Sequence, residues 1–156
     1  MIDASPLIFL ARGELLELLK LLGGVILVPE PVASEILRRG PNDRTARALQ
    51  TAPWIRIVEA VPVPAVIQNW DLGPGETSVL AWANAHSGSE AILDDLAARR
   101  CATVLNIPVR GTIGLVLAAK KNGRIDQASP VIEHLRRAGM YLSDRVINEA
   151  LSLVGE

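Results

Sequence analysis

The stretch EAILDDLAAR, residues 90–99, joins a short apolar run to two adjacent carboxylates. Residues 91–93 suit a strand that is buried on both faces, and Asp94 and Asp95 follow it directly. In open sheets of parallel strands, ligands bind at the edge where the strands end. An aspartate after a strand also often caps the next helix, and Asp94 could cap the helix expected from residue 96. The rest of the chain has to decide between a ligand site and a helix cap.

Length and composition predict a compact globular chain. It has 156 residues, of which 49% are hydrophobic and 21% are charged, so we expect one domain over residues 1–156. Sixteen basic and seventeen acidic residues nearly balance, so any contact with nucleic acid needs a local basic patch. Three tryptophans, one tyrosine and one phenylalanine are too few for a broad base-stacking platform.

Cysteine usage and hydropathy indicate where the chain acts. Its single cysteine, Cys101, excludes an internal disulfide and falls in a helical pattern that suits core packing. No apolar run approaches the roughly 20 residues that a membrane span needs, and the N-terminus lacks the pattern of a signal peptide. We therefore expect a cytoplasmic protein.

Short β-branched runs alternate with longer helical periods along the chain. Strands are predicted at residues 25–28, 54–59, 91–93 and 106–109. Helices are predicted at residues 14–22, 32–39, 44–51, 76–86, 96–105, 114–122, 130–138 and 144–154, with glycines at 40, 88, 123 and 139 as stops. This alternation predicts an α/β fold in which a parallel sheet is flanked by helices.

The beginning of the chain is the least regular part of this pattern. Only two residues precede Asp3, so a first strand there is short or incomplete. Ser5 and Pro6 then suit the N-cap and the first position of a helix. Residues 62–76 read as a loop.

Polar residues follow three of the expected strands. Asp3 follows the first, Asp94 and Asp95 follow residues 91–93, and Thr112 comes shortly after residues 106–109. If these strands are neighbours, all of these side chains meet at one edge of the sheet. Asp3 is hard to explain as a cap, because Ser5 already fills that role.

Two acids on predicted helices could join this edge. Glu76 opens its helix directly after GPG, although an acid in a first turn also complements the helix dipole. Glu35 lies in the helix after PEP, although it could instead pair with Arg38 or Arg39 at helical spacing.

A cluster of these carboxylates favours a bound cation. Two carboxylates about 4 Å apart repel by roughly 4 kcal/mol at an effective dielectric near 20, or about three pKa units. An oxygen-only donor set suits Mg²⁺ or Mn²⁺, and such an ion can activate water for attack on a phosphodiester. Arg99 and Arg110, close to the strand ends, are the expected phosphate contacts.

Five motifs occur in an order that resembles the PIN domain, from Asp3 to about Leu151. They are DASPLIFLARGELLELL, VPEPVASEI, LGPGETSVLAWA, ILDDLAAR and VRGTIGLVLAAKKNGRI. More narrowly, the chain is similar to a prokaryotic subfamily related to VapC-type toxins. The resemblance implies a doubly wound, Rossmann-like sheet and a Mg²⁺- or Mn²⁺-dependent ribonuclease that cleaves RNA. It also implies a homodimer and a small antitoxin as protein partner.

The resemblance also implies a role for individual residues. The catalytic acids that match are Asp3, Glu35, Glu76, Asp94 and Asp95. Asp3, Glu76 and one or both of the paired aspartates would hold the metal, with Asp94 coordinating and Asp95 assisting as our working hypothesis. Small polar or phosphate-binding positions match Ser5, Arg99 and Thr112.

Two other functions fit parts of the same pattern. A short first strand and scarce aromatics also suit a catalytically weak PIN-fold module that regulates or binds a protein. A phospho-acceptor receiver domain is doubly wound as well, but its acidic pair would follow the first strand, whereas here the pair follows a late one.

Overall fold

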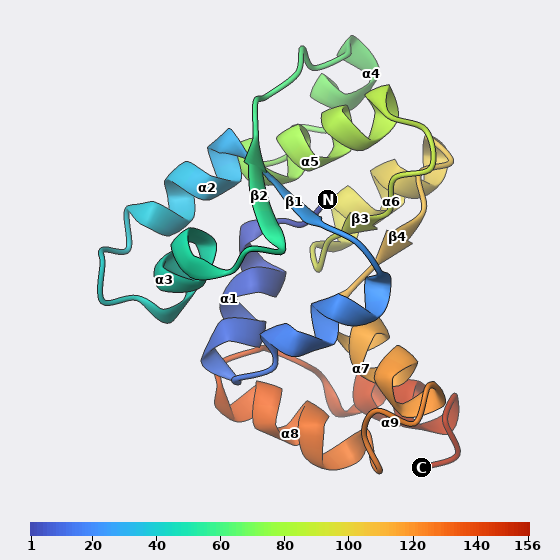
Figure 1. Cartoon of the computed structure of the whole chain (residues 1–156). Coiled ribbons are helices and arrows are strands. Elements are labelled where there is room, and N and C mark those ends of the chain that lie inside the picture. The colour runs from blue at the N-terminus through green and yellow to red at the C-terminus, as the bar shows by residue number, and fades with distance from the viewer.

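The computed structural model describes residues 1–156 as short parallel strands surrounded by helices (Figure 1). The strands are β1 (Ile26–Pro29), β2 (Ile55–Val58), β3 (Ala91–Ile92) and β4 (Val109–Arg110). The helices are α1 (Ala4–Arg12), the 3-10 helix η1 (Leu16–Leu22), α2 (Glu30–Leu37), α3 (Arg44–Thr51), α4 (Ala65–Gln68), α5 (Pro74–Ala85), α6 (Leu96–Val104), α7 (Thr112–Lys121), α8 (Ser129–Arg137) and α9 (Asp144–Ser152). The predicted α/β class is confirmed.

The four strands form two parallel pairs. Ile26 of β1 lies opposite Ile55 of β2, and Ala91 of β3 lies opposite Val109 of β4. Each pair is a separate two-stranded sheet. The regular strands therefore do not by themselves make the single doubly wound sheet that was predicted.

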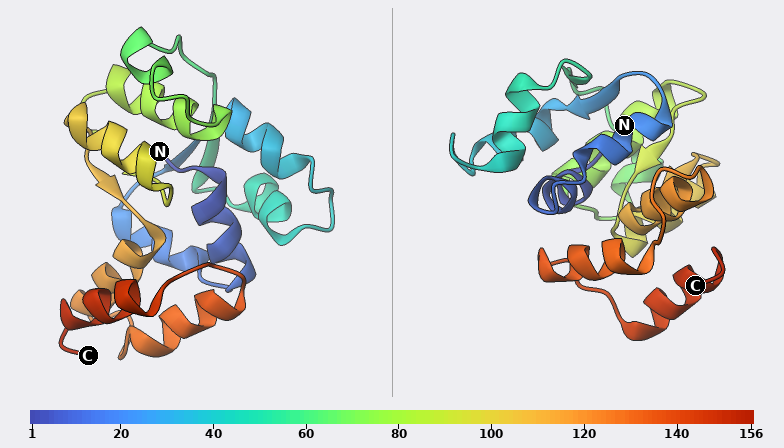
Figure 2. Two further views of the ribbon diagram at one scale, coloured as in Figure 1. Left: turned by 180° about the vertical axis from the view of Figure 1, so that it is seen from behind. Right: turned by 60° about the horizontal axis from the view of Figure 1, so that its bottom comes forward.

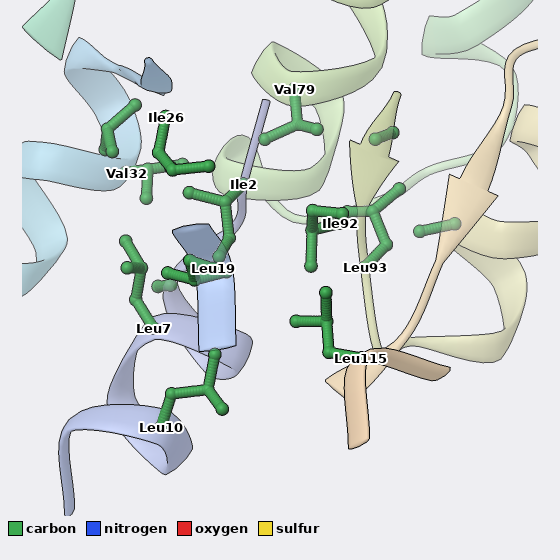
Figure 3. Packing of buried hydrophobic residues seen from close by; sticks show 14 of the residues in the cluster. Ile2, Leu7, Leu10, Leu19, Ile26, Val32, Val79, Ile92, Leu93 and Leu115 are labelled. Atoms are coloured by element: carbon green, nitrogen blue, oxygen red, sulfur yellow. The ribbon is translucent and has the colours of Figure 1, made fainter. Parts of the chain in front are cut away.

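The N-terminal residues lie between the two pairs. Ile2 forms an isolated parallel bridge with Ile92, and its amide donates to the carbonyl of Leu27 at 3.1 Å. On the other side, the amide of Ile92 donates to the carbonyl of Met1 at 2.8 Å. Ile2 is fully buried between Ile26 and Ile92 (Figure 3). The first strand is thus reduced to an isolated bridge at Ile2.

One hydrophobic core connects both sheets to the helices around them. Leu10 of α1, Leu19 of η1 and Leu115 of α7 are fully buried and point toward the residues of the strands (Figure 3). Burying each such side chain contributes roughly 1.5–3 kcal/mol. Cys101 of α6 belongs to the same core, as predicted.

The helices surround the strands on several sides. In Figure 1, α2 and α3 lie beside β1 and β2, and α6 lies beside β4, whereas α4 and the pair α8 and α9 occupy opposite ends of the molecule. The left view of Figure 2 shows the same arrangement from behind. No helix combines the length and the hydropathy that crossing a bilayer requires.

Most predicted elements differ from the structure by at most two residues at their ends, and three differ in kind or by more. The helix expected over 14–22 is a 3-10 helix that begins at Leu16, because Glu14 turns the chain with a φ of 56°. The strand expected over 106–109 begins only at Val109, because Asn106 has a φ of 56° and ends the turn after α6. The predicted loop 62–76 contains α4, which buries Ile67 in the core.

The cap predicted for the first helix is also wrong. Asp3, not Ser5, occupies the N-cap position of α1. Ser5 is the second residue of the helix and is exposed, and Pro6 is the third. The chain enters α1 directly after the bridge at Ile2, which leaves no residues for a later cap.

Candidate active site

Three of the predicted polar groups lie at the same edge of the strands. Asp3 directly follows the bridge at Ile2, and its amide donates to the carbonyl of Ile92 at 3.1 Å. Asp94 lies two residues after the end of β3, and Thr112 begins α7 two residues after β4. Because all of these segments run in parallel, their carboxyl ends share one edge, as predicted.

Asp3 is a buried carboxylate with like-charged neighbours. It is only 5% exposed, and its side chain forms no hydrogen bond that caps α1. Burial is the main cause that raises the pKa of Asp3 to about 7, and the charges of Glu76 and Glu35 raise it further. The N–H groups of Ala4 and Ser5 act in the opposite direction. The three acids therefore interact across α1, α2 and α5.

Gly75 allows α5 to approach this carboxylate. A Cβ atom at this position would lie 2.5 Å from Oδ1 of Asp3, which is closer than van der Waals contact permits. Sequence reasoning gave Gly75 no role, although the signal was present. It is a glycine in the first turn of a helix, where alanine is the better helix former, and such a glycine often marks a close approach.

Thr112 holds both oxygens of Asp94. Its amide donates to Oδ1 at 2.7 Å, and its hydroxyl donates to Oδ2 at 2.6 Å. Thr112 is fully buried, so this arrangement fixes the carboxylate against α7. Burial raises the pKa of Asp94, whereas the hydrogen bonds from Thr112 and the charge of Arg99 oppose this shift.

A family model described as a PIN domain matches residues 1–156. The chain belongs to the PIN domain family. No curated protein and no solved structure matches it significantly. The resemblance inferred from the five motifs is thus confirmed at the level of the family. PIN domains have a nuclease-type fold and are generally metal-dependent nucleases, so the acidic edge is the part of this chain to compare with an active site.

The other acids predicted for the active site of the PIN domain differ from one another in burial and in contacts. Asp95 is the N-cap of α6 and accepts a hydrogen bond from the amide of Ala98 at 2.8 Å. The idea that Asp94 is this cap is therefore wrong. Glu76 is half-buried in the first turn of α5, whereas Glu35 of α2 is exposed.

The acids of the PIN domain fall into two groups rather than one metal-binding cluster. Asp3 interacts with Glu35 and Glu76, while Asp94 is held by Thr112. No three His, Cys, Asp or Glu side chains lie close enough together to hold a metal ion. The donor chemistry nevertheless fits Mg²⁺ or Mn²⁺, because only carboxylate oxygens are offered and a cation would neutralise the like charges around Asp3.

Replacing Gly75 with alanine is expected to reduce any nuclease activity that depends on Asp3 by about 10- to 100-fold, because displacing a catalytic group by about 1 Å can cost that much. The new Cβ would force the Asp3 carboxylate out of its position. Overpacking would also lower the free energy of unfolding by roughly 1–3 kcal/mol.

The matched control for Gly75→Ala is the same change in an Asp3→Ala background. There the new Cβ meets no carboxylate, so alanine should be neutral or stabilising through its higher helix propensity. Chemical denaturation of the four proteins measures this coupling. An equal loss of stability in both backgrounds would show that Gly75 serves α5 alone.

Replacing Thr112 with valine removes the hydroxyl from Asp94 while keeping the shape of the side chain. If Asp94 is a metal ligand, Mn²⁺ affinity measured by calorimetry should fall by about 10- to 100-fold, the effect of losing a residue that orients a metal ligand. The lost hydrogen bond to a charged group should cost roughly 1.5–3 kcal/mol of stability. Thr112→Ser keeps the hydroxyl and should restore most of the Mn²⁺ affinity. Failure of serine to do so would indicate a packing role for the methyl group.

Proposed function

We propose that this PIN domain is a divalent-metal-dependent endoribonuclease, which hydrolyses phosphodiester bonds in RNA. The observation that supports the proposal best is the buried Asp3 carboxylate at the edge where the strands end, whose pKa is raised by burial and further by the charges of Glu76 and Glu35. Burying a carboxylate next to two others is unfavourable unless a cation compensates. Because the chain belongs to a family of metal-dependent nucleases, a bound metal ion would explain why the Asp3 carboxylate lies in this position.

The proposed roles follow from where each side chain lies. Asp3, Glu76 and Asp94 would hold Mg²⁺ or Mn²⁺, and Glu35 would bind or orient the ion from the exposed side. When bound, such an ion supplies positive charge that polarises a phosphodiester and lowers the pKa of water. Thr112 would keep the Asp94 carboxylate in one orientation.

Asp95 would assist from a distance. It starts α6, and the amide of Arg99, one turn later, donates to its carbonyl at 3.0 Å. The Nη1 atom of Arg99 lies 3.7 Å from the position of a Cβ on Gly111, and Oδ1 of Asp94 lies 3.0 Å from the same position. Arg99 is therefore the guanidinium best placed to contact the phosphate of a substrate at Asp94.

Cleavage of labelled single-stranded RNA, followed on denaturing gels, tests this proposal. We expect cleavage with Mg²⁺ or Mn²⁺, none in EDTA, and recovery when metal is added in excess. A DNA strand of the same sequence, run in parallel, reports whether the activity is selective for RNA. Cleavage that is indifferent to EDTA would contradict a metal-dependent mechanism.

We further propose that the protein is the cytoplasmic toxin of a toxin–antitoxin pair and forms a homodimer. The support is the order of the five motifs, which resembles the VapC-related subfamily. Controlled expression should arrest bacterial growth, and co-expression of the neighbouring reading frame should relieve the arrest. Light scattering of the purified protein measures the dimer. Normal growth with an active nuclease would argue against the toxin role alone.

We also propose that the sheets act as one doubly wound layer within a single domain. The order would be β2, β1, residues 1–3, β3 and β4. The hydrogen bonds of Ile2 to Leu27, and of Ile92 to Met1, support this order because they connect the two parallel pairs.

A second candidate function is a regulatory or protein-binding module with weak catalysis. It is favoured by the state of Asp94, because both of its oxygens already accept hydrogen bonds from Thr112. The separation of the acids into two groups points the same way. Calorimetry with Mn²⁺ distinguishes the two candidates. Strong Mn²⁺ binding together with RNA cleavage supports the nuclease, whereas the absence of both supports the module.

A further inference from the structure

A large cavity opens beside Asp94. Its volume is about 670 Å³, within the range of sites that hold small ligands. It lies between α6, α7, α9 and the segment that joins α8 to α9, and Asp94, Arg99 and Gly111 are among its lining residues. A ligand in this cavity would therefore be continuous with the proposed active site.

The cavity has apolar walls that are open to solvent. Leu96, Val146 and Leu153 are exposed apolar side chains, and all three line it. Tyr141 lines it as well and is 93% exposed, the only exposed aromatic residue of the chain. An exposed aromatic ring offers a flat face on which the base of a nucleotide can stack.

The backbone on either side of Tyr141 is anchored to the rest of the molecule. The adjacent Met140 is buried in the core, and its amide donates to the carbonyl of Leu135 at 3.0 Å. Arg136, near the end of α8, contacts Asp144 at the start of α9 at 3.3 Å, which closes the segment at its base. The ring is therefore presented from an anchored backbone, which reduces the entropy lost on binding.

Arg99 gives the same cavity a positive charge close to Asp94. Its guanidinium forms no ion pair, whereas Arg110, which also lines the cavity, is paired with Glu90 at 2.9 Å. A planar stacking surface, apolar walls and an unpaired guanidinium match the three parts of a nucleotide: its base, its sugar and its phosphate. A helix of a protein partner would use the apolar walls but has no general need of the cation.

We propose that this cavity binds one unpaired nucleotide of the RNA, with its base stacked on Tyr141 and its phosphate on Arg99. The inference rests on the proposed function, because it identifies the nucleotide next to the scissile bond. Binding there places the adjoining phosphodiester beside Asp94. It also explains how a chain with few aromatics holds single-stranded RNA: one ring at the site is enough.

A double-mutant cycle, in which one change is Tyr141→Ala and the other is an abasic position in the RNA, tests the stacking directly. The probes are a short single-stranded RNA and versions of it with one abasic position each, measured by fluorescence anisotropy in EDTA. Tyr141→Ala should weaken binding of the intact RNA by about 10-fold, in the range that stacking supplies. At one abasic position the same change should have little further effect, because the partner of the ring is already absent.

Two protein controls separate stacking from general surface effects. Tyr141→Phe keeps the ring and should bind like the wild type. Val104→Ala removes another exposed apolar side chain of α6, 64% exposed and outside the cavity, and should leave affinity unchanged. An equal effect of Tyr141→Ala on intact RNA and on every abasic RNA overturns the proposal. A change in oligomeric state without a change in RNA affinity overturns it in favour of a second copy of the chain.

The neighbouring residues Arg99 and Arg100 give a matched pair for the phosphate contact. Both are exposed on α6, but only Arg99 lines the cavity. Arg99→Ala should weaken RNA binding and lower the salt dependence by about one charge, and Arg100→Ala should do neither. Equal effects of the two would overturn the phosphate contact.

Binding and cleavage distinguish this inference from the proposed function. RNA binding in which the effect of Tyr141→Ala depends on the abasic position, without RNA cleavage, would support the nucleotide site and contradict the nuclease. RNA cleavage without this dependence would support the nuclease and contradict the nucleotide site.

Discussion

Replacing Asp3 with asparagine is expected to abolish RNA cleavage and, at the same time, to stabilise the metal-free protein. Cleavage should fall by at least about 100-fold, the effect of removing one preorganised electrostatic group from an active site. Stability should rise because asparagine fills the same buried space without a charge, so that Glu76 and Glu35 no longer repel it. Opposite changes in activity and stability are typical of a residue kept for function.

The stabilisation should depend on pH in a defined direction. The pKa of Asp3 is about 7 in the folded chain and 3.8 in its ordinary state. A raised carboxyl pKa means that folding is favoured while the group is protonated, so the wild type loses stability as pH rises from about 4 to about 7. The loss is up to about 4 kcal/mol, at roughly 1.4 kcal/mol per pKa unit. Asp3→Asn lacks this loss.

Thermal and chemical unfolding in EDTA measure the difference. At pH 8 the variant should be the more stable protein, and at pH 4 the advantage should have disappeared. Asp126→Asn changes the same chemical group on the exposed surface and should shift neither stability nor cleavage. An Asp3→Asn protein that is less stable at pH 8, or that still cleaves RNA, would contradict the assigned role.

The parallel arrangement of the strands made much of this edge predictable. Strands that run in one direction end at one edge, so Asp3, Asp94 and Thr112 could be expected to meet there. The hydrogen bonds between Ile2 and Leu27, and from Thr112 to Asp94, place them along that edge. Periodicity likewise predicted the bounds of α3 without error. The helix begins where predicted because the Asp43 side chain caps it, accepting hydrogen bonds from the amides of residues 45 and 46.

The contacts that lie outside local sequence were not predictable. Ser5 was a reasonable cap by residue type, but the bridge at Ile2 leaves only Asp3 in that position. The approach of Gly75 to Asp3 depends on how the start of α5 meets the residue before α1, across more than 70 residues of chain. In the sequence, Tyr141 was distinguished only as the single tyrosine of the chain. Its exposure could not be predicted, because it depends on the adjacent Met140 being buried in the core.

Asp94 and Asp95 are expected to respond in opposite ways to substitution, although they are adjacent. Asp94→Asn keeps the shape that Thr112 contacts but removes the charge, so cleavage should fall by at least about 100-fold, while the midpoint of unfolding changes little. Asp95→Ala removes the cap of α6, which should cost about 1 kcal/mol of stability. Its cleavage rate should stay within a factor of about three of the wild type.

The distinction follows from which neighbour each carboxylate faces. Asp94 is held by Thr112, which begins the helix after the next strand, so it points along the edge where substrate would bind. Asp95 is turned toward Ala98 within its own helix and is exposed. Asp95→Asn is the decisive control, because asparagine caps helices as well as aspartate does and should restore the stability lost in Asp95→Ala. If Asp95→Asn instead loses as much cleavage as Asp94→Asn, both carboxylates take part in the reaction directly, and the indirect role proposed for Asp95 is wrong.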